Sequence, residues 1–127
     1  MIVMAHGLAG VGEMRLDAFA ERFTAEGSAG LTVDYGHLGA SSGEPRRRFD
    51  IGKQLQDWRS AVAYVRTPDG VDPDGVVVWG TSFGGGHSII TAVQDKRVAA
   101  AIAQESSATS GRHQRRRRRD VPWLPGV

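Results

Sequence analysis

The chain has 127 residues, no cysteine and a formal net charge of +2, a size that allows one small domain with a buried core. The absence of cysteine excludes a disulfide framework and a thiolate metal site. No apolar run reaches the length of about 18 residues that a membrane-spanning helix needs, and residues 1–5 lack the basic segment of a signal peptide. We therefore expect a cytoplasmic protein with no membrane partner.

Apolar segments alternate with amphipathic segments along residues 1–105, which predicts parallel strands joined by helical crossovers. The strands are expected at residues 1–5, 31–34, 76–79 and 98–103, and the helices at 13–26, 50–66 and 85–93. Residues 1–5 form a continuous apolar run, which is typical of a strand covered on both faces. The fold class is therefore α/β, with helices on both faces of a sheet of about four parallel strands.

Spacing and end signals support the two longer helices. Apolar side chains recur at helical spacing in both, and Gly27 and Asp50 are the expected C-terminal and N-terminal caps of the first and second helix. The apolar positions are Leu16, Phe19, Ala20 and Phe23 in the first helix, and Ile51, Leu55, Trp58, Val62 and Val65 in the second.

The pentapeptide Gly80-Thr81-Ser82-Phe83-Gly84 directly follows the apolar run 76–79. This is a G-x-S-x-G pattern between a predicted strand and a predicted helix, the context in which a sharp turn exposes a serine hydroxyl above a sheet. Small residues two positions before and after the serine allow the tight turn. Ser82 is therefore the candidate catalytic nucleophile.

Three motifs in order resemble the α/β-hydrolase superfamily, in particular its dienelactone hydrolase, acetyl xylan esterase and Xaa-Pro dipeptidyl-peptidase-like branch. They are His6-Gly7-Leu8-Ala9-Gly10, the loop from Asp34 to Pro45, and Gly80 to Gly84. In the loop, Gly36-His37 stands where the family usually has Arg-Gly. The resemblance implies a partial hydrolase fold with strand order 2-1-3-4.

The resemblance also implies how an ester or related acyl bond would be hydrolysed. The backbone N–H groups of Leu8 and Phe83 would stabilise the oxyanion, with His6, Gly7, Gly80 and Gly84 as supporting motif residues. No cofactor and no metal are expected. The substrate would be a small-molecule ester or acyl compound.

Residues 1–105 lack several parts of a complete hydrolase of this kind. The N-terminal hairpin and the later strands that carry the catalytic acid and histidine are missing, so we expect weak or no activity from this chain. Glu105 and His113 are the candidates for acid and base within the sequence, although a disordered segment holds a base poorly in hydrogen-bond reach of a nucleophile.

The remaining histidines have structural interpretations as well as functional ones. His6 is expected as a turn residue on the oxyanion strand rather than as a base. We expect His37 to be solvated in a polar loop. His87 would lie one turn along the helix after Ser82, where its ring would pack near the site without acting on it.

Residues 106–127 differ sharply in character from the preceding domain. They carry six Arg against one Asp, whereas residues 1–105 carry ten Lys or Arg against 13 Asp or Glu. The run Arg115 to Arg119 has no hydrophobic period around it, which predicts a disordered tail. This composition is compatible with a phosphate-binding tail and also with translation of GC-rich DNA in the wrong reading frame. The acidic charge of residues 1–105 argues against nucleic acid as a partner.

Two alternatives to a hydrolase stay open. In the first, the chain is a non-catalytic interaction module that self-associates through exposed sheet edges and contacts acidic partners with its basic tail. In the second, it is an inert fragment.

Overall fold

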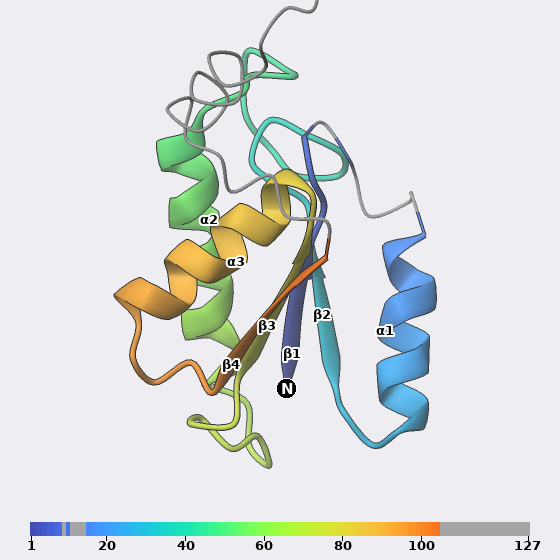
Figure 1. The fold of residues 1–127 in the computed structure, drawn as a ribbon. Helices are drawn as coiled ribbons and strands as arrows, with labels where there is room; N and C mark the ends of the chain where they lie inside the picture. Colours follow the sequence, from blue (N-terminus) through green and yellow to red (C-terminus); the bar gives the residue numbers. More distant parts are fainter. Residues whose placement is uncertain (9, 11–14, 105–127) are drawn as a thin grey trace, which may run out of the picture.

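The computed structural model describes residues 1–8, 10 and 15–104, which form a parallel four-stranded sheet flanked by helices (Figure 1). The strands are β1 (Ile2–Ala5), β2 (Gly30–Val33), β3 (Val77–Thr81) and β4 (Ala100–Gln104). Their spatial order is β2-β1-β3-β4, and every pairing is parallel. The predicted fold class and strand order are confirmed. The predicted tail lies outside the described residues.

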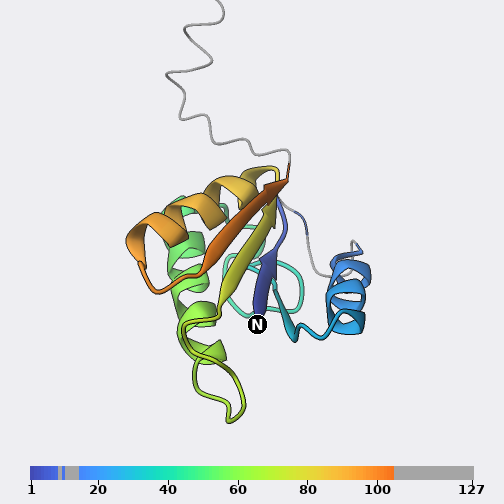
Figure 2. The ribbon, with the colours of Figure 1, turned by 60° about the horizontal axis from the view of Figure 1, so that its bottom comes forward.

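In the described part of the chain, three helices cover the two faces of the sheet. α1 (Leu16–Ala25) lies on one face, and α2 (Ile51–Val65) and α3 (Phe83–Gln94) lie on the other (Figure 2). The Asp50 carboxylate accepts a hydrogen bond from the Lys53 N–H at 3.1 Å, which confirms the predicted N-cap of α2. Gly27 ends α1 with a φ of +83°, as expected for a glycine at this position.

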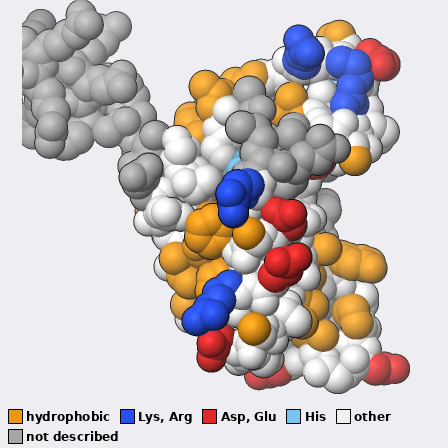
Figure 3. All heavy atoms as spheres, turned by 90° about the vertical axis from the view of Figure 1, so that its right-hand side faces the viewer, with side chains coloured by type: hydrophobic (Ala, Val, Ile, Leu, Met, Phe, Trp, Pro, Cys, Tyr) orange, Lys and Arg blue, Asp and Glu red, His pale blue; other side chains and the backbone are white. Residues whose placement is uncertain are grey.

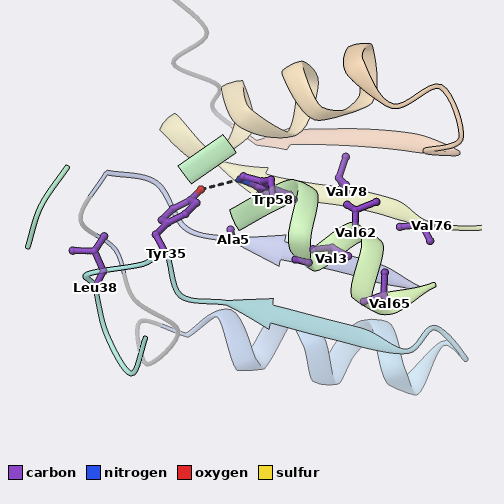
Figure 4. Close-up of a cluster of buried hydrophobic side chains, with 10 residues drawn as sticks. Val3, Ala5, Tyr35, Leu38, Trp58, Val62, Val65, Val76 and Val78 are labelled. Carbon is purple, nitrogen blue, oxygen red and sulfur yellow. Dashed lines mark hydrogen bonds between the residues drawn. The ribbon is translucent and has the colours of Figure 1, made fainter. Parts of the chain in front are cut away.

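The core has two parts because successive side chains of β1 point to opposite faces. Val3 and Ala5 face α2, where they join a cluster with Trp58, Val62 and Val65 (Figure 4). On the other face, Ile2, Met4, Leu16 and Trp79 form a smaller cluster. β1 is buried along its whole length. The central strands β1 and β3 are therefore fixed firmly relative to each other.

The helix boundaries and faces differ from the sequence expectations in three places. α1 begins at Leu16, and α3 begins directly at Phe83 rather than at Gly85. In α2 the buried face includes Gln54, whereas Ile51 is 47 % exposed. Within the described residues, no helix is long and apolar enough to cross a membrane.

Candidate active site

Ser82 lies in the sharp turn between β3 and α3. Its backbone has φ 52° and ψ −117°, a conformation that residues with a side chain rarely adopt. The Ser82 N–H donates to the Gln104 carbonyl of β4 at 2.8 Å, and the Ser82 carbonyl accepts from the Gly85 N–H at 3.1 Å. Both neighbouring elements therefore hold the serine peptide in its strained conformation.

The glycines of the pentapeptide are required by close backbone contacts. A Cβ atom at Gly80 would collide with the Gly84 carbonyl, and one at Gly84 would collide with the His6 carbonyl. The helix thus approaches the ends of β1 and β3 more closely than a side chain allows. This is the physical reason for small residues two positions before and after Ser82.

The segment after β1 passes directly beside the serine. Ala5 pairs with Gly80, so the residues that follow the two strands lie at the same carboxyl end of the sheet. A Cβ atom at Gly7 would lie 2.9 Å from the Ser82 Cβ and 3.4 Å from the Phe83 nitrogen. Phe83 is the first residue of α3, so its N–H has no acceptor within the helix. The two predicted oxyanion residues, Leu8 and Phe83, thus flank the contact between Gly7 and Ser82.

A buried tyrosine fixes the peptide between β1 and Gly7. The Tyr35 hydroxyl donates to the His6 carbonyl at 3.1 Å. It accepts from Trp58 Nε1 at 3.1 Å (Figure 4). Burial raises the pKa of Tyr35 to about 12, so the hydroxyl keeps its proton. Sequence reasoning missed this support, although Tyr35 belongs to the Asp-Tyr motif after β2.

His87 is buried behind the elbow, as expected for a structural histidine. Its Nε2 lies 2.9 Å from Gln54 Oε1, and its ring meets those of Phe83 and Tyr35 edge-on. Because an amide oxygen only accepts, Nε2 carries the proton in this arrangement. Burial lowers the pKa of His87, which keeps the ring neutral.

His37 is buried, so the expectation of a solvated ring is wrong. It is only 8 % exposed, and Gly43 packs against the ring. Nδ1 lies 3.1 Å from the Pro45 carbonyl, and Nε2 lies 3.3 Å from Lys53 Nζ. The loop folds around the His37 side chain. This burial results from tertiary contacts, which the polar sequence of the loop does not indicate. His6 is likewise 8 % exposed, and its role as a turn residue stays a prediction.

A pocket of about 750 Å³ lies beside the elbow. Its described walls are Leu8, His37, Leu38, Gly39, Arg46, Arg47 and Phe49. Leu8 directly follows the glycine that contacts Ser82, and the Phe49 ring meets the Phe83 ring with centroids 5.3 Å apart. The pocket therefore adjoins both predicted oxyanion residues.

The candidate acid and base, Glu105 and His113, lie outside the described residues, so their roles stay predictions. Among residues 1–8, 10 and 15–104, no three His, Cys, Asp or Glu side chains converge as a metal site requires.

A parallel sheet in the order β2-β1-β3-β4, with a strained serine between β3 and α3, is the arrangement of an α/β-hydrolase. The sequence matches the Alpha/beta hydrolase family over residues 2–127, and the chain belongs to this family.

Relatives include both bacterial and fungal proteins. The chain is 60 % identical over 104 residues to the quorum-quenching protein AidA of Acinetobacter baumannii, covering 82 % of this chain and 34 % of the relative. It is 38 % identical over 102 residues to the thiohydrolase aneE of Aspergillus aculeatus, covering 80 % and 32 %. The crystal structure of the α/β-hydrolase GrgF from a Penicillium species matches with a TM-score of 0.76 and 29 % identity, over 91 % of this chain and 41 % of that one. The chain thus spans about a third of the length of these curated relatives.

Proposed function

We propose that Ser82 is the nucleophile of an acyl-bond hydrolase. The observation that carries this proposal is the Ser82 backbone conformation between β3 and α3, with the Gly7 backbone packed against it. A serine held in this way projects from the sheet toward an incoming carbonyl group. The family membership supports the same chemistry.

The proposed reaction begins with attack of Ser82 Oγ on the acyl carbon. The carbonyl π electrons move to oxygen, and the N–H groups of Leu8 and Phe83 stabilise the resulting oxyanion by roughly 3 kcal/mol each. A base takes the hydroxyl proton and passes it to the leaving group as the acyl-enzyme forms. Water then attacks the acyl carbon of the acyl-enzyme, the base takes a proton from that water, and the proton passes to Ser82 Oγ as the bond to the acyl group breaks and the acid leaves.

The base and its acid partner are proposed to come from sequence beyond residue 104. Glu105 and His113 are the candidates within this chain, and a chain without a well-held base turns over weakly or not at all. One relative is named a thiohydrolase and another a polyketide transferase, and both names are compatible with reactions at an acyl group. The narrower placement in the dienelactone hydrolase and Xaa-Pro dipeptidyl-peptidase-like branch is supported by the three sequence motifs alone. The proposed cytoplasmic location is supported by the composition alone.

Covalent labelling tests the nucleophile independently of turnover. The chain is treated with a fluorophosphonate and with p-nitrophenyl butyrate, and the modified residue is found by mass spectrometry. We expect a single label on Ser82 that is absent from Ser82→Ala and retained in Ser60→Ala, which changes an exposed serine of α2. A label on another serine of the unmodified chain, or equal labelling of Ser82→Ala, would reject the proposal.

An interaction module is the second candidate, because β4 has little cover. Four of its five residues are exposed, and Ile102 is 42 % exposed; Ile89 and Val93 of α3 are exposed as well. Within the described residues β4 pairs on one side only, and an open strand edge with exposed apolar side chains favours association with another chain.

A further inference from the structure

The pocket beside the elbow combines apolar walls with a basic rim. Leu8, Leu38 and Phe49 supply the apolar part, and Leu8 and Phe49 are 62 % and 44 % exposed. Its volume of about 750 Å³ lies in the range of small-molecule sites. Exposed apolar side chains around a hollow next to a reactive group are typical of a ligand wall. The pocket therefore has room and surface for an aliphatic chain.

Two arginines line the pocket, but they have different roles. Arg46 is occupied, since its guanidinium donates to the carbonyls of Gly39 at 2.7 Å and Ser41 at 2.5 Å. Arg47 is held only through its backbone, whose N–H donates to the His37 carbonyl at 2.8 Å. Within the described residues, the Arg47 guanidinium makes no hydrogen bond or ion pair. It is thus the cation of the rim that is available to a ligand.

The carboxylates near this loop accept hydrogen bonds from nearby backbone N–H groups. Asp34 accepts from the Ala40 N–H and Glu44 from the Arg46 N–H, while Asp50 caps α2 and pairs with Arg48 at 3.4 Å. No carboxylate is among the described residues that line the pocket. Lys53 adds positive charge behind His37, 3.3 Å from its Nε2. Basic side chains, with an acidic one beside them, lie at the upper edge of the face seen in Figure 3, the end toward which the strands run. The described wall of the pocket therefore offers two arginines and no carboxylate to a ligand.

We propose that this pocket binds the acyl part of a substrate whose aliphatic chain ends in a carboxylate, with Arg47 as the counter-ion. The apolar walls would contact the chain, and the planar guanidinium would bind the carboxylate through two N–H groups. The assignment of this ligand as the acyl part of the substrate rests on the proposed function of Ser82. It narrows the substrate class to half-esters, or other acyl derivatives, of short dicarboxylic acids.

Binding rather than turnover tests the proposal, which separates it from the test of Ser82. Monomethyl adipate and dimethyl adipate have the same chain and differ in one charge. Each is titrated into the ¹⁵N-labelled chain, and amide shifts are followed by NMR. We expect the half-ester to bind about fivefold more tightly, as an exposed ion pair allows, with shifts at Leu8, Gly39 and Phe49. Added salt should reduce this preference.

Two variants assign the preference to one side chain. Arg47→Gln should bring the ratio of the two dissociation constants close to one, whereas Arg48→Gln should leave it unchanged. Equal binding of the two esters, no binding of either, shifts confined to another surface, or an unchanged ratio in Arg47→Gln would overturn the proposal. The labelling experiment on Ser82 does not depend on the binding of either ester. Failure of the pocket proposal and failure of the nucleophile proposal therefore appear in different experiments.

Discussion

Gly84 occupies the closest backbone contact between α3 and β1. A side chain there would enter the space of the His6 carbonyl, which belongs to a fixed backbone rather than to a flexible side chain. The segment that carries Leu8 would have to move away from Ser82. A single methyl group at this position therefore affects both the stability of the fold and the geometry of the site.

Gly84→Ala should lower the free energy of unfolding by about 2–3 kcal/mol, as measured by urea denaturation. Gly52→Ala is the matched control, because Gly52 also lies in the first turn of a helix but a Cβ atom would meet only Asp50 Oδ1 at 3.4 Å. Alanine there should be neutral or stabilise by about 0.5 kcal/mol. Equal effects of the two substitutions would contradict the close contact at Gly84.

Tyr35 links three segments through one hydroxyl group. Tyr35→Phe removes the donor to the His6 carbonyl and the acceptor of Trp58 Nε1, and leaves both groups buried. We expect a loss of about 1–3 kcal/mol in the free energy of unfolding. Tyr64→Phe, at an exposed residue of α2, should change it by less than about 0.5 kcal/mol. The same loss in both variants would show that the Tyr35 hydroxyl contributes nothing specific.

His87 makes stability depend on pH in a direction fixed by its burial. Burial lowers its pKa in the folded chain, so the unfolded chain binds the proton more readily. This contribution is complete above the unfolded pKa of about 6.5 and is lost as the pH falls below that value. The lowered pKa values of Asp50 and Asp95 act only in a more acidic range.

Urea denaturation at pH 7 and pH 5 measures this effect. The chain should lose more stability between the two pH values than His87→Gln, which retains a hydrogen-bonding side chain but does not titrate. Identical losses in the two proteins would mean that the proton does not distinguish the folded from the unfolded state at this residue.

At the scale of elements, a partly buried arginine ties the ends of α2 and α3. Arg66 Nη1 lies 2.6 Å from Asp95 Oδ2, and Arg66 Nε donates to the Pro73 carbonyl at 2.9 Å. This pairing lowers the pKa of Asp95, chiefly through the hydrogen bond from Arg66. The side chain of Arg66 is 14 % exposed, against 80 % for Arg22, which pairs with Glu26 along α1. The two ion pairs should therefore differ in strength.

Arg66→Met should cost about 1.5–3 kcal/mol of unfolding free energy, since it removes two hydrogen bonds that involve a charged group. Arg22→Met should cost less than about 0.5 kcal/mol, because its pair is exposed and lies within one helix. Thermal or urea unfolding distinguishes them. A ratio near one would contradict the role assigned to Arg66 at the junction of α2 and α3.

The sequence predicts elements well where a local signal exists. The period of α2, the cap at Asp50 and the apolar run of β1 are local features, and the structure confirms them. The burial of His37 and the exposure of Ile51 were predicted wrongly, because both depend on tertiary packing that the local spacing of residues does not encode. The contact of Tyr35 with the His6 carbonyl joins residues far apart in the chain, so no spacing rule indicates it.

At the scale of the whole molecule, the sequence motifs predict the order of the strands. The contacts around Ser82 cannot be predicted in this way, because they form only when the strands and helices pack together. The backbones at Gly7, Gly80 and Gly84 come from two strands and a helix, and their mutual contacts arise once β1 pairs with β3. The same assembly leaves β2 and β4 at the edges of the sheet. The two edges differ in chemistry, since β4 carries an exposed isoleucine and β2 an exposed threonine.

Self-association should therefore use β4 rather than β2. Two copies related by a twofold axis would pair their β4 strands antiparallel and cover Ile102 in the same step. Sedimentation velocity across a range of protein concentrations should show a dimer, and Ile102→Lys should shift it to monomer because a charge would be buried at the pairing edge. Thr32→Lys, at the β2 edge, should leave the dimer intact. A monomer at every concentration would reject association through the sheet, whereas a dimer disrupted only by Thr32→Lys would move the interface to β2.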